Sequence, residues 1–174
     1  MVAGNKKLDE KWLYCASITN NSKVKGKYSQ SYQKISDIVK KEKCKGVTPF
    51  IDEKAIYLEV IEGMLAKGKR SKLPIVDFTF GIIHNNSSKY RLIEAKFDVK
   101  DLKNIDKKNI LDKVSHSRDV MSEDGVQIEG GAVILINKSD IVQQQKDWFS
   151  RQLMPFGNYQ IMTIDDLYNR YFIA

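Results

Sequence analysis

Two neighbouring apolar segments, residues 75–84 and 89–97, constrain the fold more than any other part of the chain. Both are rich in β-branched and aromatic residues, and the turn-forming sequence Asn85-Asn86-Ser87-Ser88 separates them. This pattern predicts an antiparallel hairpin that closes at His84 and Lys89. Since apolar residues fall on both faces of the hairpin, we expect it to lie inside a sheet that is covered on its two sides.

The expected register gathers charged side chains on one face of the hairpin. It places Asp77 opposite Lys96 and Thr79 opposite Glu94, with all four side chains on the same face. Charged groups inside a covered sheet need partners or a metal ion, because their desolvation is costly. Cross-strand ion pairs on a solvated face are the alternative interpretation of this spacing.

Composition indicates an ordinary globular protein. The 174 residues, 42% hydrophobic and 29% charged, suit one domain with a sizeable core. No apolar run approaches the roughly 18 residues of a membrane-spanning helix, so we expect no membrane partner. The first seven residues lack the apolar core of a signal peptide, which favours a cytoplasmic location. Cys15 and Cys44 are isolated, which argues against a structural zinc site and a disulfide framework.

The net charge of +7 is concentrated in two clusters that suit a polyanionic partner. The first cluster contains Lys23, Lys25, Lys27, Lys34, Lys40, Lys41, Lys43 and Lys45. The second cluster leads directly into the strand of Asp77 and contains Lys67, Lys69, Arg70 and Lys72. Solvated faces or disordered arms are the common alternative for such charge runs. The place of the second cluster beside acidic residues favours a nucleic acid, whose phosphates it would neutralise.

The first fifty residues predict a helical, lysine-rich extension. We expect a helix from Leu8 to Ala16, a polar loop from Ser17 to Lys27 and a second helix from Ser29 to Lys43. Residues 51–174 form the expected core, and the two parts make one compact protein.

The core sequence predicts helices that alternate with strands. An apolar stripe of helical period indicates a helix from Asp52 to Ala66, ahead of the hairpin. The all-apolar run from Ala132 to Asn137 indicates a strand buried on both faces, which is typical of a parallel neighbour reached through a crossover helix. The other expected elements are helices at 104–121, 141–153 and 165–171 and a strand at 159–163, with Thr163 or Asp165 capping the last helix.

Several common catalytic motifs are absent or incomplete. The sequence from Gly63 to Lys69 approaches a phosphate-binding P-loop, but Arg70 stands where the motif needs Ser or Thr, and a helix rather than a strand precedes it. His84 and His116 are too few for histidine-metal nuclease motifs or a zinc hydrolase, and no Gly-x-Ser-x-Gly sequence occurs. Nucleotide, zinc and serine-hydrolase chemistry are therefore disfavoured.

With a helix, an Asp strand, a Glu-x-Lys strand, a helix and a buried strand in this order, the chain resembles the PD-(D/E)XK nuclease superfamily over about residues 52–172. The motif residues are Asp77, Glu94 and Lys96. In the family a proline directly precedes the aspartate, whereas here Pro74 lies three positions before it. The resemblance implies an α/β, restriction-endonuclease-like fold, with a mixed central sheet flanked by helices.

The resemblance also implies Mg²⁺ or Mn²⁺ as cofactor, as one or two ions. Asp77, Glu94 and the carbonyl of Ala95 would bind metal, and Lys96 would orient the attacking water or stabilise developing charge. Relatives often add a glutamate from the preceding helix. At 100° per residue, Glu59 lies at the edge of the apolar stripe and Glu62 points away from it, which favours Glu59 as the added ligand.

The expected function is a magnesium-dependent endonuclease that hydrolyses phosphodiester bonds, with DNA preferred over RNA. An RNA-cleaving enzyme of the same superfamily and a non-catalytic nucleic-acid-binding module with this fold are the alternatives. A structural ion-pair cluster, with the basic surface serving a protein partner, is a third interpretation. Homodimer formation stays open. The candidate nucleic-acid contacts are Lys67, Lys69, Arg70, Lys72, Lys113, His116, Ser117 and Arg118.

Overall fold

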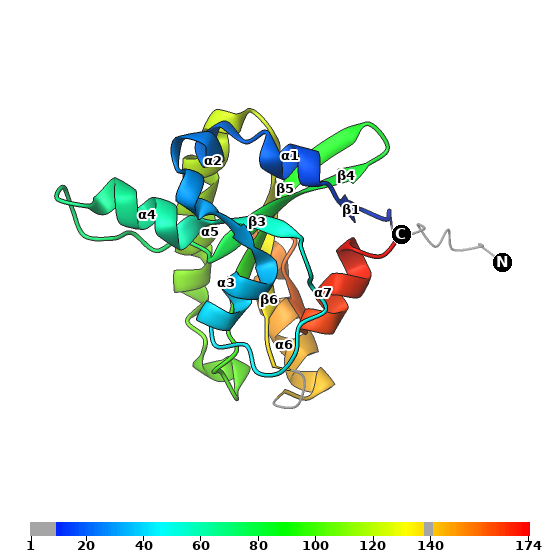
Figure 1. The fold of residues 1–174 in the computed structure, drawn as a ribbon. Coiled ribbons are helices and arrows are strands. Elements are labelled where there is room, and N and C mark those ends of the chain that lie inside the picture. The colour runs from blue at the N-terminus through cyan, green and yellow to red at the C-terminus, as the bar shows by residue number, and fades with distance from the viewer. Residues whose placement is uncertain (1–9, 138–140) are drawn as a thin grey trace.

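The computed structural model describes residues 10–137 and 141–174, which form one mixed seven-stranded sheet with helices on both faces (Figure 1). The strand order is β2-β3-β4-β5-β6-β7, and β1 pairs with the same edge of β4 that β3 uses further along. The strands are β1 Leu13–Tyr14, β2 Tyr32–Lys34, β3 Lys54–Tyr57, β4 Phe78–His84, β5 Ser87–Ala95, β6 Gln127–Leu135 and β7 Gln160–Met162. The α/β class predicted from the sequence is confirmed.

Helices precede or connect most of these strands. The α-helices are α1 Ala16–Asn20, α2 Lys23–Lys27, α3 Ile35–Lys41, α4 Leu58–Ala66, α5 Lys107–Met121, α6 Gln143–Leu153 and α7 Ile164–Tyr171. Short 3-10 helices cover Ser29–Ser31, Leu102–Asn104, Ser122–Asp124 and Met154–Phe156. No helix in the described part of the chain combines the length and apolar character needed to cross a membrane.

The hairpin of β4 and β5 is present, but its register differs by two residues from the predicted one. Phe78 pairs with Ile93 and His84 pairs with Ser87, so the loop contains only Asn85 and Asn86. Asn85 has a φ of 51°, a left-handed conformation that asparagine tolerates better than most residues. The two-residue loop makes the hairpin tighter than a four-residue loop would. Because the shift is an even number, every side chain keeps its predicted face.

The corrected register changes which residues are opposed. Thr79 lies opposite Leu92 rather than Glu94. Continuing the same pairing by one step places Asp77 opposite Glu94, so the predicted pairing of Asp77 with Lys96 is wrong. Two carboxylates therefore meet where the sequence analysis expected a carboxylate and an amine.

Both faces of the sheet are covered, as predicted. Helices α4, α5 and α6 pack on the face that carries Tyr90, Leu92 and Ile134. Helices α3 and α7 pack on the opposite face, against Phe80 and Ile93. A carboxylate at the end of β4 or β5 is thus enclosed by apolar layers and loses most of its hydration.

The parallel half of the sheet follows the prediction from the apolar run at 132–137. Strand β6 pairs in parallel with both β5 and β7. Its residues from Gly131 to Leu135 are all buried. The predicted helices before and after it are present as α5 and α6. Helix α7 begins with a capping box, in which the Thr163 hydroxyl accepts from the Asp166 backbone N–H and the Asp166 carboxylate accepts from the Thr163 backbone N–H.

The N-terminal predictions are mostly wrong in detail. In place of a helix up to Ala16, residues 13–14 form strand β1, and α1 begins where that helix was expected to end; Leu8 lies outside the described residues. The expected polar loop contains α1 and α2. It is held to the sheet, because the Thr19 hydroxyl accepts a hydrogen bond from the backbone N–H of Gly81 at 2.9 Å. The N-terminal segment therefore belongs to the same sheet as the core.

Two predicted helices each contain a strand. The expected helix at 29–43 is a 3-10 turn, β2 and then α3, and the expected helix at 52–66 is β3 followed by α4. Strand β3 bridges β2 and β4, and Ala55 and Ile56 are fully buried in it. Helical periodicity does not separate these cases, because a short buried strand contributes apolar residues that also fit a helical stripe.

Candidate active site at the ends of β4 and β5

Asp77 and Glu94 lie side by side at one end of the hairpin. Asp77 immediately precedes β4 and is 5% exposed, and Glu94 is the penultimate residue of β5 and is fully buried. The Asp77 carboxylate accepts a hydrogen bond from the backbone N–H of Ala95 at 2.5 Å, and its carbonyl accepts one from the N–H of Leu58 at 2.8 Å. The start of α4 and the end of β5 thus fix the position of Asp77.

Burial and a neighbouring negative charge govern the ionisation of Asp77. Burial raises the pKa of Asp77 well above its usual range, and the neighbouring Glu94 carboxylate raises it further. The Ala95 N–H and the ammonium group of Lys113 act in the opposite direction without offsetting these effects. An additional positive charge close to Asp77 would therefore stabilise its ionised form.

Two lysines converge on a single oxygen of Glu94. The Nζ atoms of Lys96 and Lys113 lie 2.8 Å and 2.7 Å from Glu94 Oε1. The other oxygen, Glu94 Oε2, is buried and has no hydrogen-bond partner among the residues that the structure describes. Buried carboxylate oxygens are rarely left without a donor or a cation, so Oε2 is an acceptor that the described residues leave unsatisfied.

Glu59, which the sequence analysis favours as an added metal ligand, lies half-buried in the first turn of α4. Burial is the main cause that raises the pKa of Glu59, whereas Lys113 and Lys72 lower it. Glu94 also raises this pKa, which places Glu59 within electrostatic range of the pair. The structure thus brings Glu59 towards the site without giving it a contact with Asp77 or Glu94.

The prediction that Glu62 points away from the apolar stripe is wrong. Glu62 is fully buried. Its carboxylate accepts hydrogen bonds from Arg70 Nη1 at 2.5 Å and from the backbone N–H of Leu73 at 2.7 Å, and it lies 2.7 Å from Nε2 of His116. The loop after α4 folds back over this carboxylate. Glu62 is therefore a further buried carboxylate, and residues of the chain itself supply its partners.

Helix α5 presents three of the predicted nucleic-acid contacts to the interior instead. Ser117 is fully buried, accepts a hydrogen bond from the Val76 N–H at 3.0 Å and donates one to the Lys113 carbonyl at 2.7 Å. His116 contacts Glu62, and Lys113 contacts Glu94. The Ser117 hydroxyl is therefore unavailable to a phosphate at the surface. These residues are three and four positions apart, which places them on one face of the helix. This spacing was the sign in the sequence that they could point together into the interior.

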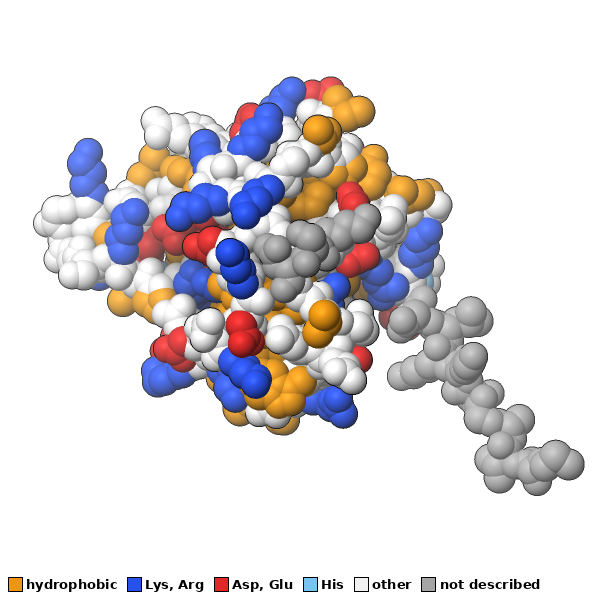
Figure 2. All heavy atoms as spheres, turned by 90° about the horizontal axis from the view of Figure 1, so that it is seen from below, with side chains coloured by type: hydrophobic (Ala, Val, Ile, Leu, Met, Phe, Trp, Pro, Cys, Tyr) orange, Lys and Arg blue, Asp and Glu red, His pale blue; other side chains and the backbone are white. Residues whose placement is uncertain are grey.

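The remaining predicted contacts lie at the surface. Lys67, Lys69, Arg70, Lys72 and Arg118 are exposed, although Arg70 is bound to Glu62. Seen from below, Lys and Arg side chains are spread over the face and acidic side chains lie among them (Figure 2). The surface is basic without a single dense patch on this face.

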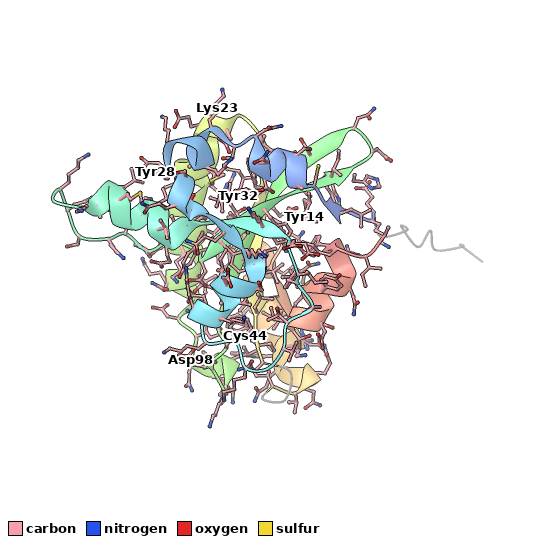
Figure 3. All side chains as sticks on the ribbon, viewed as in Figure 1. Tyr14, Lys23, Tyr28, Tyr32, Cys44 and Asp98 are labelled. Carbon is pink, nitrogen blue, oxygen red and sulfur yellow. The ribbon has the colours of Figure 1, made fainter. Side chains whose placement is uncertain are left out.

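Part of the early lysine cluster is engaged locally. Lys27 pairs with Glu123, and Lys34 pairs with Asp52 at 2.7 Å. The Tyr32 ring, on the N-terminal segment in Figure 3, lies 4.7 Å from Nζ of Lys25. The two ion pairs join the first segment to later residues, and all three contacts leave fewer charges for an external partner.

The oxygen atoms that this site offers to a metal ion come from two carboxylates. No group of three or more His, Cys, Asp or Glu side chains in residues 10–137 and 141–174 is arranged to hold a metal ion. Mg²⁺ commonly binds through one or two carboxylates, keeps several waters and takes its remaining ligands from substrate phosphate. Asp77 and Glu94, with the unpartnered Oε2, supply that smaller set of oxygen ligands.

Comparison of the chain with protein-family models, with curated proteins and with solved structures gives no match.

Proposed function

We propose that the protein is a magnesium-dependent nuclease with a restriction-endonuclease-like fold. The observation that carries the proposal is the buried pair of Asp77 and Glu94, in which one carboxyl group has a raised pKa and Glu94 Oε2 lacks a partner. A cation between the two would relieve the repulsion and complete the shell of Oε2. Lys96 lies beside the pair and reaches Glu94 at 2.8 Å.

The order of elements supports the same family. Helix α4, the hairpin of β4 and β5, helix α5 and the parallel strand β6 follow one another as the PD-(D/E)XK core requires. The acidic residues lie at the end of the hairpin from which the chain leaves β5 towards α5. Helix α4 adds Glu59 near the pair, as such cores often do.

A bound Mg²⁺ or Mn²⁺ would polarise the phosphate and lower the pKa of an attacking water. Asp77, Glu94 and the Ala95 carbonyl would hold the ion. Lys96, whose side chain is 24% exposed, would orient the water or stabilise the negative charge that develops on phosphorus-bound oxygens. Asp77 would be kept in place during the reaction by the N–H groups of Ala95 and Leu58 that bond its carboxylate and carbonyl.

DNA is the preferred substrate in this proposal, and the +7 charge of the chain suits any polyanion. RNA cleavage at the same site and nucleic-acid binding without turnover are distinguished by the assay below. The ion-pair interpretation draws support from the two lysines on Glu94 Oε1, and it predicts no dependence on metal at all.

Cleavage of supercoiled plasmid and of a structured RNA, each with Mg²⁺, Mn²⁺ or EDTA, tests the proposal. We expect metal-dependent cleavage, which Asp77→Asn and Glu94→Gln each reduce by about 100-fold or more, because metal coordination supplies several kcal/mol of transition-state stabilisation. Lys96→Ala should also reduce cleavage by about 100-fold, because it removes a positive charge that stabilises the charge developing in the transition state. Asn can still accept the hydrogen bond from Ala95, so Asp77→Asn preserves the local geometry.

Asp98→Asn is the matched control, since Asp98 is an exposed carboxylate shortly after β5. It should leave cleavage unchanged. If neither polymer is cut with metal while both are bound, the protein is a binding module. If neither is cut nor bound, the buried acids form a structural ion-pair cluster.

A further inference from the structure

Lys113 occupies the centre of the acidic site rather than its rim. It projects from α5, and its side chain is 15% exposed. Its Nζ atom donates a hydrogen bond to Glu94 Oε1 at 2.7 Å, and its charge also interacts with Asp77 and Glu59. One ammonium group thus faces the three carboxylates that the sequence analysis assigns to metal binding.

The structure holds Lys113 in this place through the turn of α5 that follows it. The Lys113 carbonyl accepts from the Ser117 hydroxyl, which in turn accepts from the N–H of Val76, the residue before Asp77. His116, on the same helical face, contacts the buried Glu62 carboxylate. These bonds tie α5 to the segment that carries Asp77, so the ammonium is part of a built site.

The lysines of the site do not balance the full negative charge that its carboxylates can carry. Glu94, Asp77 and Glu59 together carry up to three negative charges, and Lys96 and Lys113 provide two positive charges. Both ammonium groups lie on Glu94 Oε1, which leaves Oε2 without a partner. A divalent cation brings two charges and accepts several oxygen ligands at once, so it would compete with an ammonium group for this carboxylate.

We propose that Lys113 is the counter-ion of Glu94 in the metal-free protein and that a divalent cation displaces it. The identity of the cation rests on the function proposed above. Lys96 is less suited to this role, because it lies two residues from Glu94 on the same segment and is more exposed, at 24%. Lys113 therefore stabilises the fold without metal and weakens the affinity for metal.

The test uses the full chain with Lys113→Met, which keeps an unbranched side chain only one atom shorter and removes its charge. Titration with Mn²⁺ in a calorimeter gives the dissociation constant, and thermal unfolding in EDTA gives the stability without metal. We expect Lys113→Met to bind Mn²⁺ about tenfold more tightly than the wild type. We also expect a lower Tm in EDTA, which Mn²⁺ restores.

Lys108→Met is the control, because Lys108 lies on the same helix, is 81% exposed and forms an exposed ion pair with Asp112. It should change neither the affinity nor the Tm in EDTA. Lys113→Arg retains the charge and supplies a second folded variant, which should bind Mn²⁺ no more tightly than the wild type.

The outcomes separate this inference from the proposed function. If the wild type binds Mn²⁺ and Lys113→Met binds it equally or more weakly, Lys113 is not a competitor, and the nuclease proposal stands. The same conclusion follows if Lys108→Met tightens binding as much, since the effect is then one of net charge. If neither the wild type nor Lys113→Met binds Mn²⁺, both the displacement and the metal site are wrong.

Discussion

The pKa of a buried carboxylate in this protein depends on the backbone, the loops and the charged side chains around it. Glu62 is an example, since burial raises its pKa, but hydrogen bonds from Arg70, His116 and the Leu73 N–H outweigh burial and bring the pKa down to about 2. A helical projection places this residue on the solvent side, because it ignores the loop that folds back from Arg70 to Leu73. Asp77 shows the opposite result, because burial and Glu94 together raise its pKa.

The low pKa of Glu62 predicts an acid-dependent loss of stability. A carboxyl group whose pKa is lower in the folded than in the unfolded protein stabilises the fold at high pH, and this contribution declines as pH falls from about 4.5 towards about 2. In Glu62→Gln the decline should be absent. The variant should also lose about 2 kcal/mol of unfolding free energy at pH 7, because charged hydrogen bonds are lost.

Urea unfolding of both proteins between pH 2.5 and pH 7 measures this difference. Glu123→Gln, at an exposed ion pair with Lys27, is the control and should cost little at any pH. Parallel pH profiles for wild type and Glu62→Gln would contradict the assignment.

At the scale of elements, α5 is the part that assembles the site. Its first turn is fixed by Asp106, whose side chain caps the helix by accepting from the Asn109 N–H at 3.2 Å. From that start, the spacing of Lys113, His116 and Ser117 directs all three towards the sheet. The helix therefore contributes functional groups to the interior, whereas its charged composition alone suggested contacts at the surface.

Removal of one hydroxyl should show how firmly α5 is anchored. Ser117→Ala leaves the buried N–H of Val76 without a partner, which should cost about 1–3 kcal/mol in unfolding free energy. Chemical denaturation measures the change. Ser115→Ala, at an exposed position on the same helix, should change the stability by less than about 0.5 kcal/mol. Equal effects for the two variants would show that the contact with Val76 is not structural.

At the scale of the whole molecule, residues 10–50 are part of the sheet and not an appendage. Strand β2 covers the edge of β3, and β1 pairs with β4. Tyr90 adds a further tie, since its hydroxyl donates to the Asp124 carboxylate, which also accepts from the backbone N–H of Val24. The apolar cores on both faces include residues from this segment.

A chain limited to residues 51–174 should therefore not fold. The truncation removes Ile35, Ile38 and Val39, which are fully buried against one face of the sheet, and it exposes the edge of β3. Circular dichroism and urea unfolding test this directly. We expect no cooperative transition, whereas the full chain should unfold cooperatively. A cooperative transition with a midpoint near that of the full chain would show that the core is independent.

The sequence by itself determined the elements with strong periodicity and the residues they carry. The hairpin, the buried parallel strand, the order of helices and strands from α4 to α7, and the shared face of Thr79 and Glu94 all follow from alternation, apolar runs and turn residues, which are local properties. Only the tertiary structure decided the two-residue loop, the opposition of Asp77 and Glu94, the strands inside two predicted helices, and the interior positions of Glu62 and Lys113. These depend on which segments meet in space, because burial and pairing of a charged side chain are set by neighbours distant in the chain.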